Sequence, residues 1–417
     1  MTVRVSPRQL SGVLQAPPSK SAAHRALIAA ALSGKSRIGG ILPSEDMEAT
    51  LRCLHALGIG FSREGDTVVF DGTRREHEPI VDCGESGSTL RFFVPIFAAL
   101  GKTVTFCGRG RLPERPLTTY EECLPSHGVR MTKPPFPGTV LTVSGQLRGG
   151  RYEVAGDVSS QFITGLLFAL PLLSEDSEIV LTSPLQSAGY VDMTLEILSL
   201  AGVTVKRTAQ GFFVAGGGHY ALREHTVEGD WSQAAFLLTA GAIAGDVTVT
   251  GLRPDSTQGD KRIEALLRDM GADIAWTPQG LRVKKSALRA CDADVSDIPD
   301  LVPILSVAAA CAEGTSRFYN AARLRIKESD RLATTAAMLT ALGGKPLEEA
   351  DALQVTGAPL HGGCVAGAND HRIVMSAAIA AATADGDVEI TDAHSINKSW
   401  PLFFENYKRI GGAVHEL

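Results

Sequence analysis

Lysine, arginine and hydroxyl side chains stand in several places where an apolar helix is expected to begin. In the stretch Pro17–Leu27 (PPSKSAAHRAL), Lys20, Ser21 and Arg25 stand just before a run of small apolar residues. Proline disfavours helix in the residue before it, so the helix is expected to begin after the two prolines. A helix N-terminus offers unpaired N–H groups and the positive end of the helix dipole, so these side chains would complete an anion site. Taken alone, the stretch is also typical of a capped helix with solvated basic residues.

The same combination recurs along the chain, at other expected helix starts and in loops rich in Gly and Pro. The residues concerned are Glu85, Ser88, Arg91, Ser159, Ser160, Gln161, Ser232, Asp300, His371 and Arg372, with the dense stretches Arg109–Pro116, Arg323–Arg331 and Asn397–Pro401. At least seven cations thus gather at such places in a chain of net charge −6. Arginine binds phosphate or carboxylate in a bidentate way, so the pattern predicts a site for several negative charges. Among the carboxylates, Asp300 and Glu328 are candidates for proton transfer.

Each of these features also has a purely structural explanation when it is considered singly. Asp297 or Asp300 is then a helix cap, Arg323–Arg331 is a solvated charged face, and Lys398 is a surface lysine. Only their recurrence favours a shared anion site.

The elements that would position these residues follow a repeat. A polar loop leads into a small-residue apolar helix, then a Gly or acidic turn, a β-branched strand, and an amphipathic helix that ends at Gly. The starts lie 65 to 73 residues apart, at Ser19, Gly84, Asp157, Asp230, Asp297 and Asp370. Such regularity predicts a mixed α/β protein of six units, arranged as two halves of three that meet near Glu228–Asp230.

Composition and motifs exclude several other classes. No GxGxxG follows a strand, as a dinucleotide-binding sheet would require. The triplets Gly34–Ser36 and Gly101–Thr103 lack the upstream glycine of a P-loop and follow a helix, so we interpret them as turns. The net charge of −6 and the lack of a Lys/Arg run argue against a nucleic-acid binder.

The cysteines and the apolar runs bear on metal sites and location. Seven scattered cysteines without a CxxC pair argue against a disulfide framework and a zinc site, so no metal is expected. The N-terminal segment lacks the apolar region of a signal peptide, and no apolar stretch reaches about 18 residues without a polar break. We therefore expect a cytoplasmic protein that neither binds nor spans a membrane.

Six motifs, one or more in most of the units, resemble a known family. They are PSKS with Arg25, RxxxRP at Arg111–Pro116, VSSQ at Val158–Gln161, IPD at Ile298–Asp300, KESDR at Lys327–Arg331, and NDHR at Asn369–Arg372. Through them the chain resembles the 5-enolpyruvylshikimate-3-phosphate synthases (3-phosphoshikimate 1-carboxyvinyltransferases), a family of enolpyruvyl transferases. The resemblance extends over essentially the whole chain.

This resemblance implies a fold of two lobes, each an inside-out α/β barrel of three βαβαββ units with pseudo-threefold symmetry. One lobe would comprise residues 19–229, and the other would join residues 1–18 to residues 230–417. Substrates of the family bind in the cleft between the lobes, which close on them.

The implied reaction moves the enolpyruvyl group of phosphoenolpyruvate to the 5-hydroxyl of shikimate 3-phosphate and releases phosphate. It proceeds by addition and elimination through a tetrahedral intermediate and serves aromatic amino-acid biosynthesis. No cofactor is implied, the partners are the two small-molecule substrates, and a monomer is expected. Both substrates carry a phosphate and a carboxylate, which accounts for the many cations.

Site residues are implied position by position. Those expected to bind phosphoenolpyruvate are Lys20, Gly87, Arg111, Gln161, Arg331, Arg372 and Lys398. Those expected to bind shikimate 3-phosphate are Lys20, Ser21, Arg25, Ser159, Ser160, Gln161, Ser187, Asp300 and Lys327, with Tyr190 packing by its ring. Asp300 and Glu328 are the candidates for proton transfer, with Lys20 assisting; which one is the acid and which the base stays open.

The chain departs from the family pattern at a few positions. Many members have Asn in place of Glu85, Thr in place of Ser88, Pro in place of Phe92 and Asn in place of Arg323. These differences bear on phosphoenolpyruvate affinity and on the response to glyphosate, the family's competitor for that site. Two alternatives remain: the sister transferase acting on UDP-N-acetylglucosamine, whose loop cysteine has no counterpart in Arg109–Arg115, and a non-catalytic phosphometabolite-binding protein of the same fold.

Overall fold

The computed structural model describes all residues 1–417 and divides the chain into two compact lobes. The N-lobe is the continuous segment Lys20–Val227, and the C-lobe joins Met1–Ser19 to Glu228–Leu417. These bounds differ from the expected ones by one residue at the first crossing and by two at the second. A β-bridge between Pro18 and Gly229 explains the difference, because it ties both crossing segments to the C-lobe.

The N-lobe contains three units of like element order. The first has α1 (Lys20–Ser33), β3 (Lys35–Gly39), α2 (Glu45–Ala56), β4 (Ile59–Glu64) and β5 (Thr67–Arg74), and it borrows β14 (Glu224–Thr226). The second has β6 (Ile80–Asp82), α3 (Gly87–Ala99), β7 (Val104–Cys107), α4 (Thr118–Cys123), β8 (Val129–Thr132) and β9 (Thr139–Gly145). The third has β10 (Gly150–Val154), α5 (Ser160–Ala169), β11 (Ser177–Leu181), α6 (Ala188–Leu200), β12 (Val205–Thr208) and β13 (Gly211–Val214).

The C-lobe repeats the same order. Its first unit has β2 (Leu10–Gln15), α7 (Trp231–Ala244), β15 (Gly245–Thr250), α8 (Arg262–Asp269), β16 (Asp273–Thr277) and β17 (Gly280–Lys284). Its second has β18 (Ala293–Asp294), α9 (Val302–Ala310), β19 (Thr315–Tyr319), α10 (Arg331–Ala341), β20 (Lys345–Glu348) and β21 (Ala352–Thr356). Its third has β22 (Gly363–Val365), α11 (His371–Ala381), β23 (Val388–Ile390), α12 (Phe403–Arg409) and β24 (Ala413–Glu416), and it borrows β1 (Val3–Ser6).

Every unit contributes one four-stranded mixed sheet. In the order β6-β7-β9-β8, for example, the first pair of strands is parallel and the other pairs are antiparallel. The prediction of six βαβαββ units in two lobes of three is therefore confirmed. Crossovers of this kind place a helix on one face of the sheet, as the parallel pair requires.

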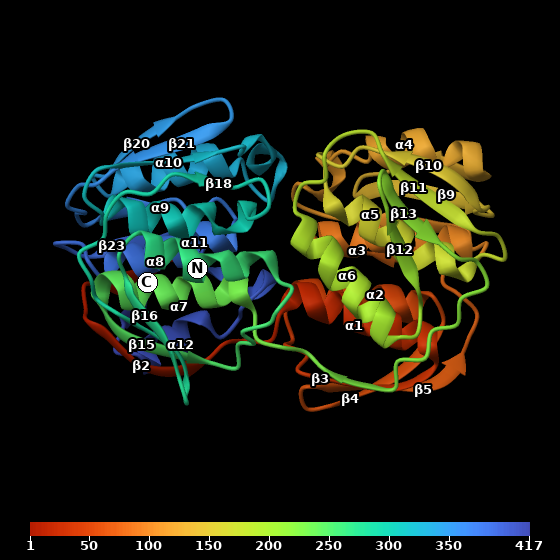
Figure 1. Ribbon diagram of the computed structural model, residues 1–417, viewed down its shortest axis with the longest axis horizontal. Helices are drawn as coiled ribbons and strands as arrows, with labels where there is room; N and C mark the ends of the chain where they lie inside the picture. The colour runs from red at the N-terminus through yellow and green to blue at the C-terminus, as the bar shows by residue number, and fades with distance from the viewer. The chain divides into compact units, whose positions relative to one another are not determined.

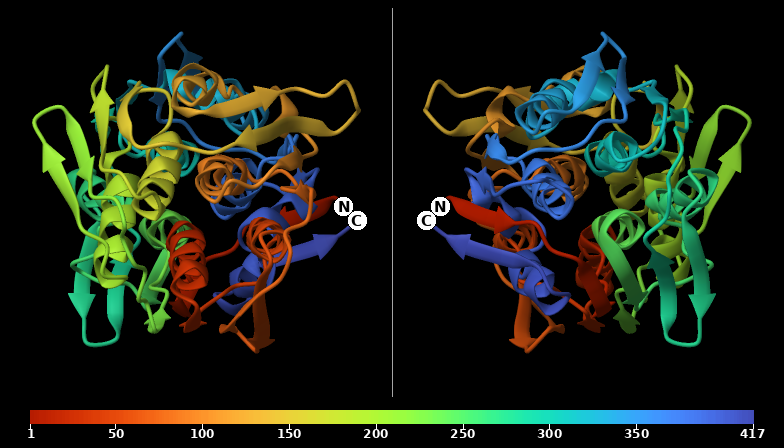
Figure 2. Two further views of the ribbon diagram at one scale, coloured as in Figure 1. Left: turned by 90° about the vertical axis from the view of Figure 1, so that its right-hand side faces the viewer. Right: turned by 90° about the vertical axis from the view of Figure 1, so that its left-hand side faces the viewer.

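Three of the sheets are completed by strands far away in the sequence. β14 pairs in parallel with β3, so the end of the N-lobe segment returns to its beginning. In the C-lobe, β2 pairs with β15, and β1 lies between β23 and β24. Figure 2 shows β1 in red beside the blue C-terminal strand β24. Residues 1–19 therefore belong to the C-lobe fold.

The first helix of each unit is packed inside its lobe, with the sheets outside (Figures 1 and 2). These helices are apolar on all sides, as a helix buried on every face should be. All residues of α7, α9 and α11 are buried, and nearly all those of α3. Alanine and glycine are frequent in them, which allows close approach of the helix axes.

Polar caps begin several of these inner helices. Ser86 caps α3, Ser159 caps α5, Asp230 caps α7 and Asp370 caps α11, each accepting a hydrogen bond from an amide of the first turn. The chemistry-bearing residues of the sequence follow these caps directly. The outer helix α4 ends at Cys123, because Pro125 follows and begins a 3-10 turn. None of the helices combines the length and apolar character that crossing a bilayer requires.

Candidate active site

Asp300 is the centre of the charged cluster in the C-lobe. It lies in the 3-10 turn Pro299–Leu301 before α9 and does not cap that turn. Its Oδ1 accepts from Arg331 Nη1 at 2.7 Å and from Lys327 Nζ at 3.4 Å, and its Oδ2 accepts from Arg372 Nη2 at 3.0 Å. Three predicted site cations, from the start of α10, the loop before it and the first turn of α11, thus converge on one predicted catalytic carboxylate.

Arg331 begins α10 and is the most enclosed of these cations, with a side chain that is 1% exposed. Besides Asp300 it contacts two more carboxylates: Nη2 donates to Glu328 Oε2 at 2.6 Å and Nε donates to Asp370 Oδ2 at 2.8 Å. Burial alone would lower the pKa of this guanidinium, but Asp370, Glu328 and Asp300 raise it above its usual value. Arg331 therefore stays charged and holds both candidates for proton transfer, Asp300 and Glu328, in one cluster.

The same contacts fix the protonation of Asp300. Burial would raise the pKa of its carboxyl group, but Arg372, Lys327 and Arg331 hold that pKa well below the usual range. At neutral pH Asp300 is an ionised carboxylate, able to accept a proton. The pKa of Lys327 is also lowered, chiefly because burial disfavours its charged form.

Arg372 and Lys398 complete the C-lobe cluster. Arg372 is in the first turn of α11, where its backbone N–H donates to the cap Asp370 and its Nη1 donates to the Asp300 carbonyl oxygen. Lys398 ends a 3-10 helix, and its Nζ donates to the carbonyl oxygen of Asn369 at 2.7 Å. Both side chains are buried, so their positions are restricted by the surrounding atoms.

A backbone irregularity marks the loop that Lys398 contacts. Ala368 and Asn369 have φ values of 52° and 50°, in the left-handed region that non-glycine residues rarely adopt. Left-handed non-glycine residues tend to occur where a loop is shaped for function. The NDHR motif begins at this Asn369.

In the N-lobe, Arg25 is the most connected of the predicted residues. Its Nε donates to Thr194 Oγ1 at 2.8 Å, its Nη1 to the carbonyl oxygen of Ser21 at 2.7 Å, and its Nη2 to that of Tyr190 at 2.8 Å. The guanidinium also lies over the rings of Phe92 and Tyr190. Burial lowers its pKa to about 10, which leaves it charged at neutral pH. Arg25 thus joins α1 to α6.

Lys20 begins α1, as predicted, and points toward an acidic partner. Its Nζ forms an ion pair with Asp46 Oδ2 at 2.8 Å, and both side chains are mostly covered. Asp46 lies in the first turn of α2 and was not among the predicted site residues. An acidic first turn is an ordinary helix feature, so its sequence gives no sign of this pairing.

Gln161 connects the starts of two inner helices. It follows Ser159 and Ser160 at the beginning of α5, its Oε1 accepts from Arg91 Nη1 at 2.6 Å, and its Nε2 donates to Ser88 Oγ at 2.8 Å. Ser88 and Arg91 both belong to α3. The VSSQ motif and the helix start at Gly87 are therefore neighbours, as a shared anion site requires.

A side chain at Gly87 would displace a guanidinium group. A Cβ added there would overlap Arg115 Nη1 and lie 3.3 Å from Arg91 Nη1. Two guanidinium groups thus lie against the backbone that begins α3. Arg115 belongs to the RxxxRP motif but was not predicted as a site residue; its place in that motif was the available signal.

Ser187 precedes α6 in a left-handed conformation with φ of 57°, and it is buried. As in the Asn369 loop, this conformation occurs at a residue predicted to bind substrate. Tyr190 in the next turn contacts Arg25 through its carbonyl oxygen and its ring.

Arg111 is the one predicted site residue that the structure leaves apart from both clusters. It is exposed and precedes the short 3-10 turn Leu112–Glu114, where its carbonyl oxygen accepts from the Glu114 amide, but its side chain makes no hydrogen bond or ion pair. Its loop nevertheless lies against the loop before α3, because Arg109 N donates to the Gly84 carbonyl oxygen at 2.8 Å.

The positions that depart from the family pattern have identifiable surroundings. Glu85 lies against Gly110, where an added Cβ would be 2.5 Å from its Oε2. Arg323 Nη2 donates to the Ser296 carbonyl oxygen at 2.7 Å. Phe92 packs beneath Arg25 and edge-on to His24, a position that proline could not fill in the same way.

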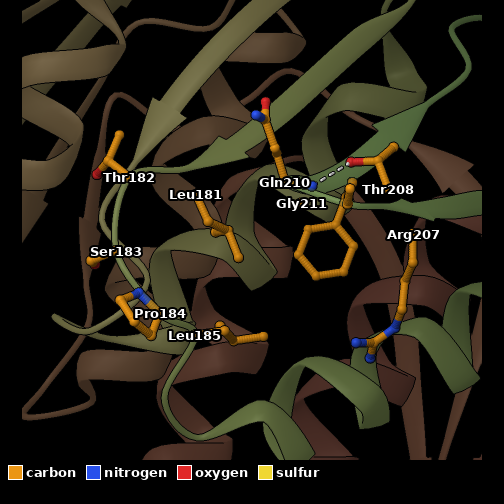
Figure 3. A pocket seen from close by; sticks show the side chains of 11 residues that line it. Leu181, Thr182, Ser183, Pro184, Leu185, Arg207, Thr208, Gln210 and Gly211 are labelled. Atoms are coloured by element: carbon orange, nitrogen blue, oxygen red, sulfur yellow. Dashed lines mark hydrogen bonds between the residues drawn. The ribbon is translucent and has the colours of Figure 1, made fainter.

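A separate pocket of about 530 Å³ lies in the N-lobe between the residues after β11 and the β12–β13 hairpin (Figure 3). Its lining includes Pro184, Arg207 and Phe212, and none of the predicted site residues. One rim residue supports the site indirectly: Ser183 Oγ donates to Asp157 Oδ1 at 2.6 Å, in the loop that leads into the VSSQ motif.

Comparisons with known proteins show which family and fold the chain is similar to. A family model described as EPSP synthase (3-phosphoshikimate 1-carboxyvinyltransferase) matches residues 5–407. A protein of Clostridium kluyveri named 3-phosphoshikimate 1-carboxyvinyltransferase is 42% identical over 419 residues, covering 99% of this chain and 98% of that protein. A solved structure of EPSP synthase from Acinetobacter baumannii has a TM-score of 0.83 and 26% identity, with full coverage of both chains. The enolpyruvyl transferase NikO from Streptomyces tendae, at 16% identity and a TM-score of 0.80, shares the fold.

Proposed function

This chain belongs to the EPSP synthase (3-phosphoshikimate 1-carboxyvinyltransferase) family, and on that premise we propose that its two polar clusters bind phosphoenolpyruvate and shikimate 3-phosphate. The protein is a transferase. It moves the enolpyruvyl group of phosphoenolpyruvate to the 5-hydroxyl of shikimate 3-phosphate, and phosphate is released. The observation that carries the residue assignment is the convergence of Lys327, Arg331 and Arg372 on Asp300.

Phosphoenolpyruvate carries a phosphate and a carboxylate, so its site needs several cations with fixed geometry. Arg331, Arg372 and Lys398 meet that need from the C-lobe, because all three are buried and held by hydrogen bonds. From the N-lobe we assign Lys20, Gln161, Arg111 and the backbone of Gly87 to the same substrate. The exposed Arg111 is free to pair with an anion, since it has no partner of its own.

Shikimate 3-phosphate presents a phosphate, a carboxylate and one hydroxyl besides the reacting one. The residues that we assign to it combine cations with hydroxyl and amide groups: Lys20, Ser21, Arg25, Ser159, Ser160, Gln161, Ser187, Asp300 and Lys327. Arg25 supports this assignment, because its guanidinium is desolvated and would interact strongly with a bound anion.

The reaction needs a base for the 5-hydroxyl and a donor for the methylene carbon of phosphoenolpyruvate. During addition the hydroxyl oxygen bonds to the central carbon of phosphoenolpyruvate while the methylene becomes a methyl group. During elimination phosphate leaves and the methyl group loses a proton, which restores the double bond. We assign the base to Asp300, because its depressed pKa keeps it ionised. Glu328, which accepts a hydrogen bond from Arg331, and Lys20 remain the candidates for donating the proton to the methylene carbon.

We also propose that the protein acts as a cytoplasmic monomer. The exposed large apolar side chains are spread over separate segments of the chain, so no single element carries an apolar patch. Examples are Val13, Ile80, Phe136 and Leu347. All seven cysteines are free, which suits a reducing compartment. Light scattering on the purified protein should give a mass near 44.0 kDa.

The decisive experiment measures phosphate release from the purified protein. We expect release only when phosphoenolpyruvate and shikimate 3-phosphate are present together. Release with UDP-N-acetylglucosamine in place of shikimate 3-phosphate would instead place the protein with the sister transferase. Saturable binding of both substrates without turnover would indicate a binding protein.

A further inference from the structure

A buried row of hydrogen bonds joins α1 to the start of α3 by way of α2. His24 Nδ1 is 2.7 Å from Thr50 Oγ1, Thr50 Oγ1 is 2.9 Å from Thr89 Oγ1, and Thr89 Oγ1 is 2.7 Å from Ser86 Oγ. All four side chains are at most 1% exposed. None of the four has a sequence signal for such a role, since buried hydroxyls and a histidine in or next to helices carry no local signal.

The row ends on the loop that is proposed to bind phosphoenolpyruvate. Ser86 caps α3 by accepting from the Thr89 amide at 3.3 Å, and it directly precedes Gly87 and Ser88. On the other side of the loop, Ser88 is held by Gln161 at 2.8 Å. The start of α3 is thus fixed from two directions, by Gln161 of α5 and by the row through Thr50.

The partners of His24 set the direction of these hydrogen bonds. Nε2 of His24 is buried and has no partner, and the ring lies edge-on to Phe92 at a centroid distance of 6.2 Å. A buried N–H without an acceptor is rarer than an unused acceptor, so the ring proton belongs on Nδ1. His24 then donates to Thr50, Thr50 to Thr89, and Thr89 to Ser86. Burial, with Lys20 and Arg25 nearby, lowers the pKa of His24 well below its usual value, so the ring stays neutral and has one proton to donate.

From this arrangement we infer that Thr50 is a positioning residue for phosphoenolpyruvate, acting through Thr89 and Ser86 on the loop Gly84–Ser88. The inference rests on the proposed function and deepens it. Thr50 touches no proposed ligand group. Its hydroxyl is the single link that accepts from α1 and donates to α3, so its loss would leave His24 and Thr89 without their fixed partner and release one side of the loop.

The test compares kinetic constants of Thr50→Val with those of the wild type. Valine keeps the shape and removes the hydroxyl. We expect the KM for phosphoenolpyruvate to rise about tenfold, because a binding contact is misplaced in ground and transition states alike. The KM for shikimate 3-phosphate and kcat should stay within about twofold. Thr50→Ser, which keeps the hydroxyl, should restore the wild-type KM.

Two further variants separate positioning from general destabilisation. Thr89→Val interrupts the same row, so the double variant should raise the KM no more than the larger single effect. Thr239→Val is the matched control, because the Thr239 hydroxyl in α7 is buried without a partner, and its KM values should be unchanged. If Thr50→Val does not fold, Thr89→Val and Thr50→Ser carry the test.

A spectroscopic readout is independent of turnover. Nitrogen-15 NMR of the wild type should show His24 protonated on Nδ1, with this proton hydrogen bonded to the Thr50 hydroxyl. The Thr50→Val variant should lose that hydrogen bond. An unchanged KM for phosphoenolpyruvate in folded Thr50→Val, or a proton on Nε2, would overturn the inference. Absence of wild-type turnover with both substrates would instead refute the proposed function. The NMR result would then still decide whether the hydrogen bonds from His24 to Ser86 run in the inferred direction.

Discussion

Asp300 is the residue whose contacts concentrate most of the proposed chemistry. Replacing it with asparagine keeps its size and removes its charge and its basicity. Loss of a general base commonly lowers the rate by about two to four powers of ten, so we expect kcat of Asp300→Asn to fall by that amount. The fold should survive, because Arg331 keeps Glu328 and Asp370 as partners. Phosphate release with both substrates measures the effect.

A matched control for this substitution lies in the same lobe. Asp294 is also an ionised carboxylate, hydrogen bonded to Ser296 and Asn320, but it contacts none of the cluster cations. Asp294→Asn should retain activity within about twofold. Near-normal turnover of Asp300→Asn would remove Asp300 from the mechanism.

The buried carboxyl group of Asp260 should make the stability of the protein depend on pH. Burial, with a smaller contribution from Asp300, raises the pKa of Asp260 from 3.8 to about 6. A carboxyl group whose pKa is raised on folding stabilises the protein below its unfolded pKa, and that stability is lost as pH rises through the folded pKa. At neutral pH the ionised group costs roughly 3 kcal/mol. Asp260→Asn, which can still accept from Ser232, should therefore unfold at a higher temperature at pH 7 and show a flatter profile between about pH 4 and pH 6.

Calorimetry of both proteins across that range measures the Asp260 effect. Equal melting temperatures at pH 7 would contradict the prediction, because they would show that the ionised Asp260 does not destabilise the folded protein.

Most of the residues to which we assign chemical roles are candidates from the sequence alone, but their partners could not be predicted. Lys20, Arg25 and Arg331 stand out because cations at helix starts have a physical meaning along the chain itself. That Lys20 pairs with Asp46, or that Arg25 donates to Thr194, depends on how separate helices pack, which no local spacing encodes. Asp260 was missed for the same reason: it gains its significance only from being buried near Asp300.

At the scale of elements, helices α3 and α5 approach each other at Gly165. A Cβ added at Gly165 would overlap the Tyr120 hydroxyl and the Arg91 carbonyl oxygen, which are hydrogen bonded to each other. Gly165→Ala should force the helices apart and lower the free energy of unfolding by about 1–3 kcal/mol, as overpacking of a core does. Denaturant titration measures this loss.

Gly386 provides the control for that substitution. It lies in the turn after α11, where an added Cβ would meet only ordinary van der Waals contacts. Gly386→Ala should change stability by less than about 0.5 kcal/mol. Equal effects of the two alanines would mean that the α3–α5 contact adjusts without cost.

The repeat of the six units was predictable, whereas the completion of their sheets was not. Turn residues and apolar runs recur at regular intervals along the chain, so the start of each unit can be recognised in the sequence. By contrast, β14 joins β3 and β1 joins β23 across large sequence distances, and short strands of this kind carry little signal of their partner. The resemblance to the family, not the pattern, assigned the N-terminal segment to the C-lobe.

At the scale of the whole molecule, the N-lobe is one continuous segment inserted into the C-lobe. The segment has its own core and closes on itself through β14 and β3. A fragment of residues 20–227 should therefore fold cooperatively, as domains with their own core do. It should show no turnover, because Asp300, Arg331 and Arg372 are absent. Circular dichroism with thermal melting checks the folding, and a broad non-cooperative melt would contradict the prediction.

The insertion has a consequence for protein synthesis on the ribosome. The segment with β1 and β2 emerges first, yet its partners β15, β23 and β24 are translated only after about half of the chain or more. The contiguous N-lobe can fold while translation continues, whereas the first nineteen residues must wait as an unpaired tail. Ribosome-arrested chains that extend far enough past residue 227 for β14 to leave the exit tunnel should thus protect the N-lobe from protease and leave that tail open to cleavage.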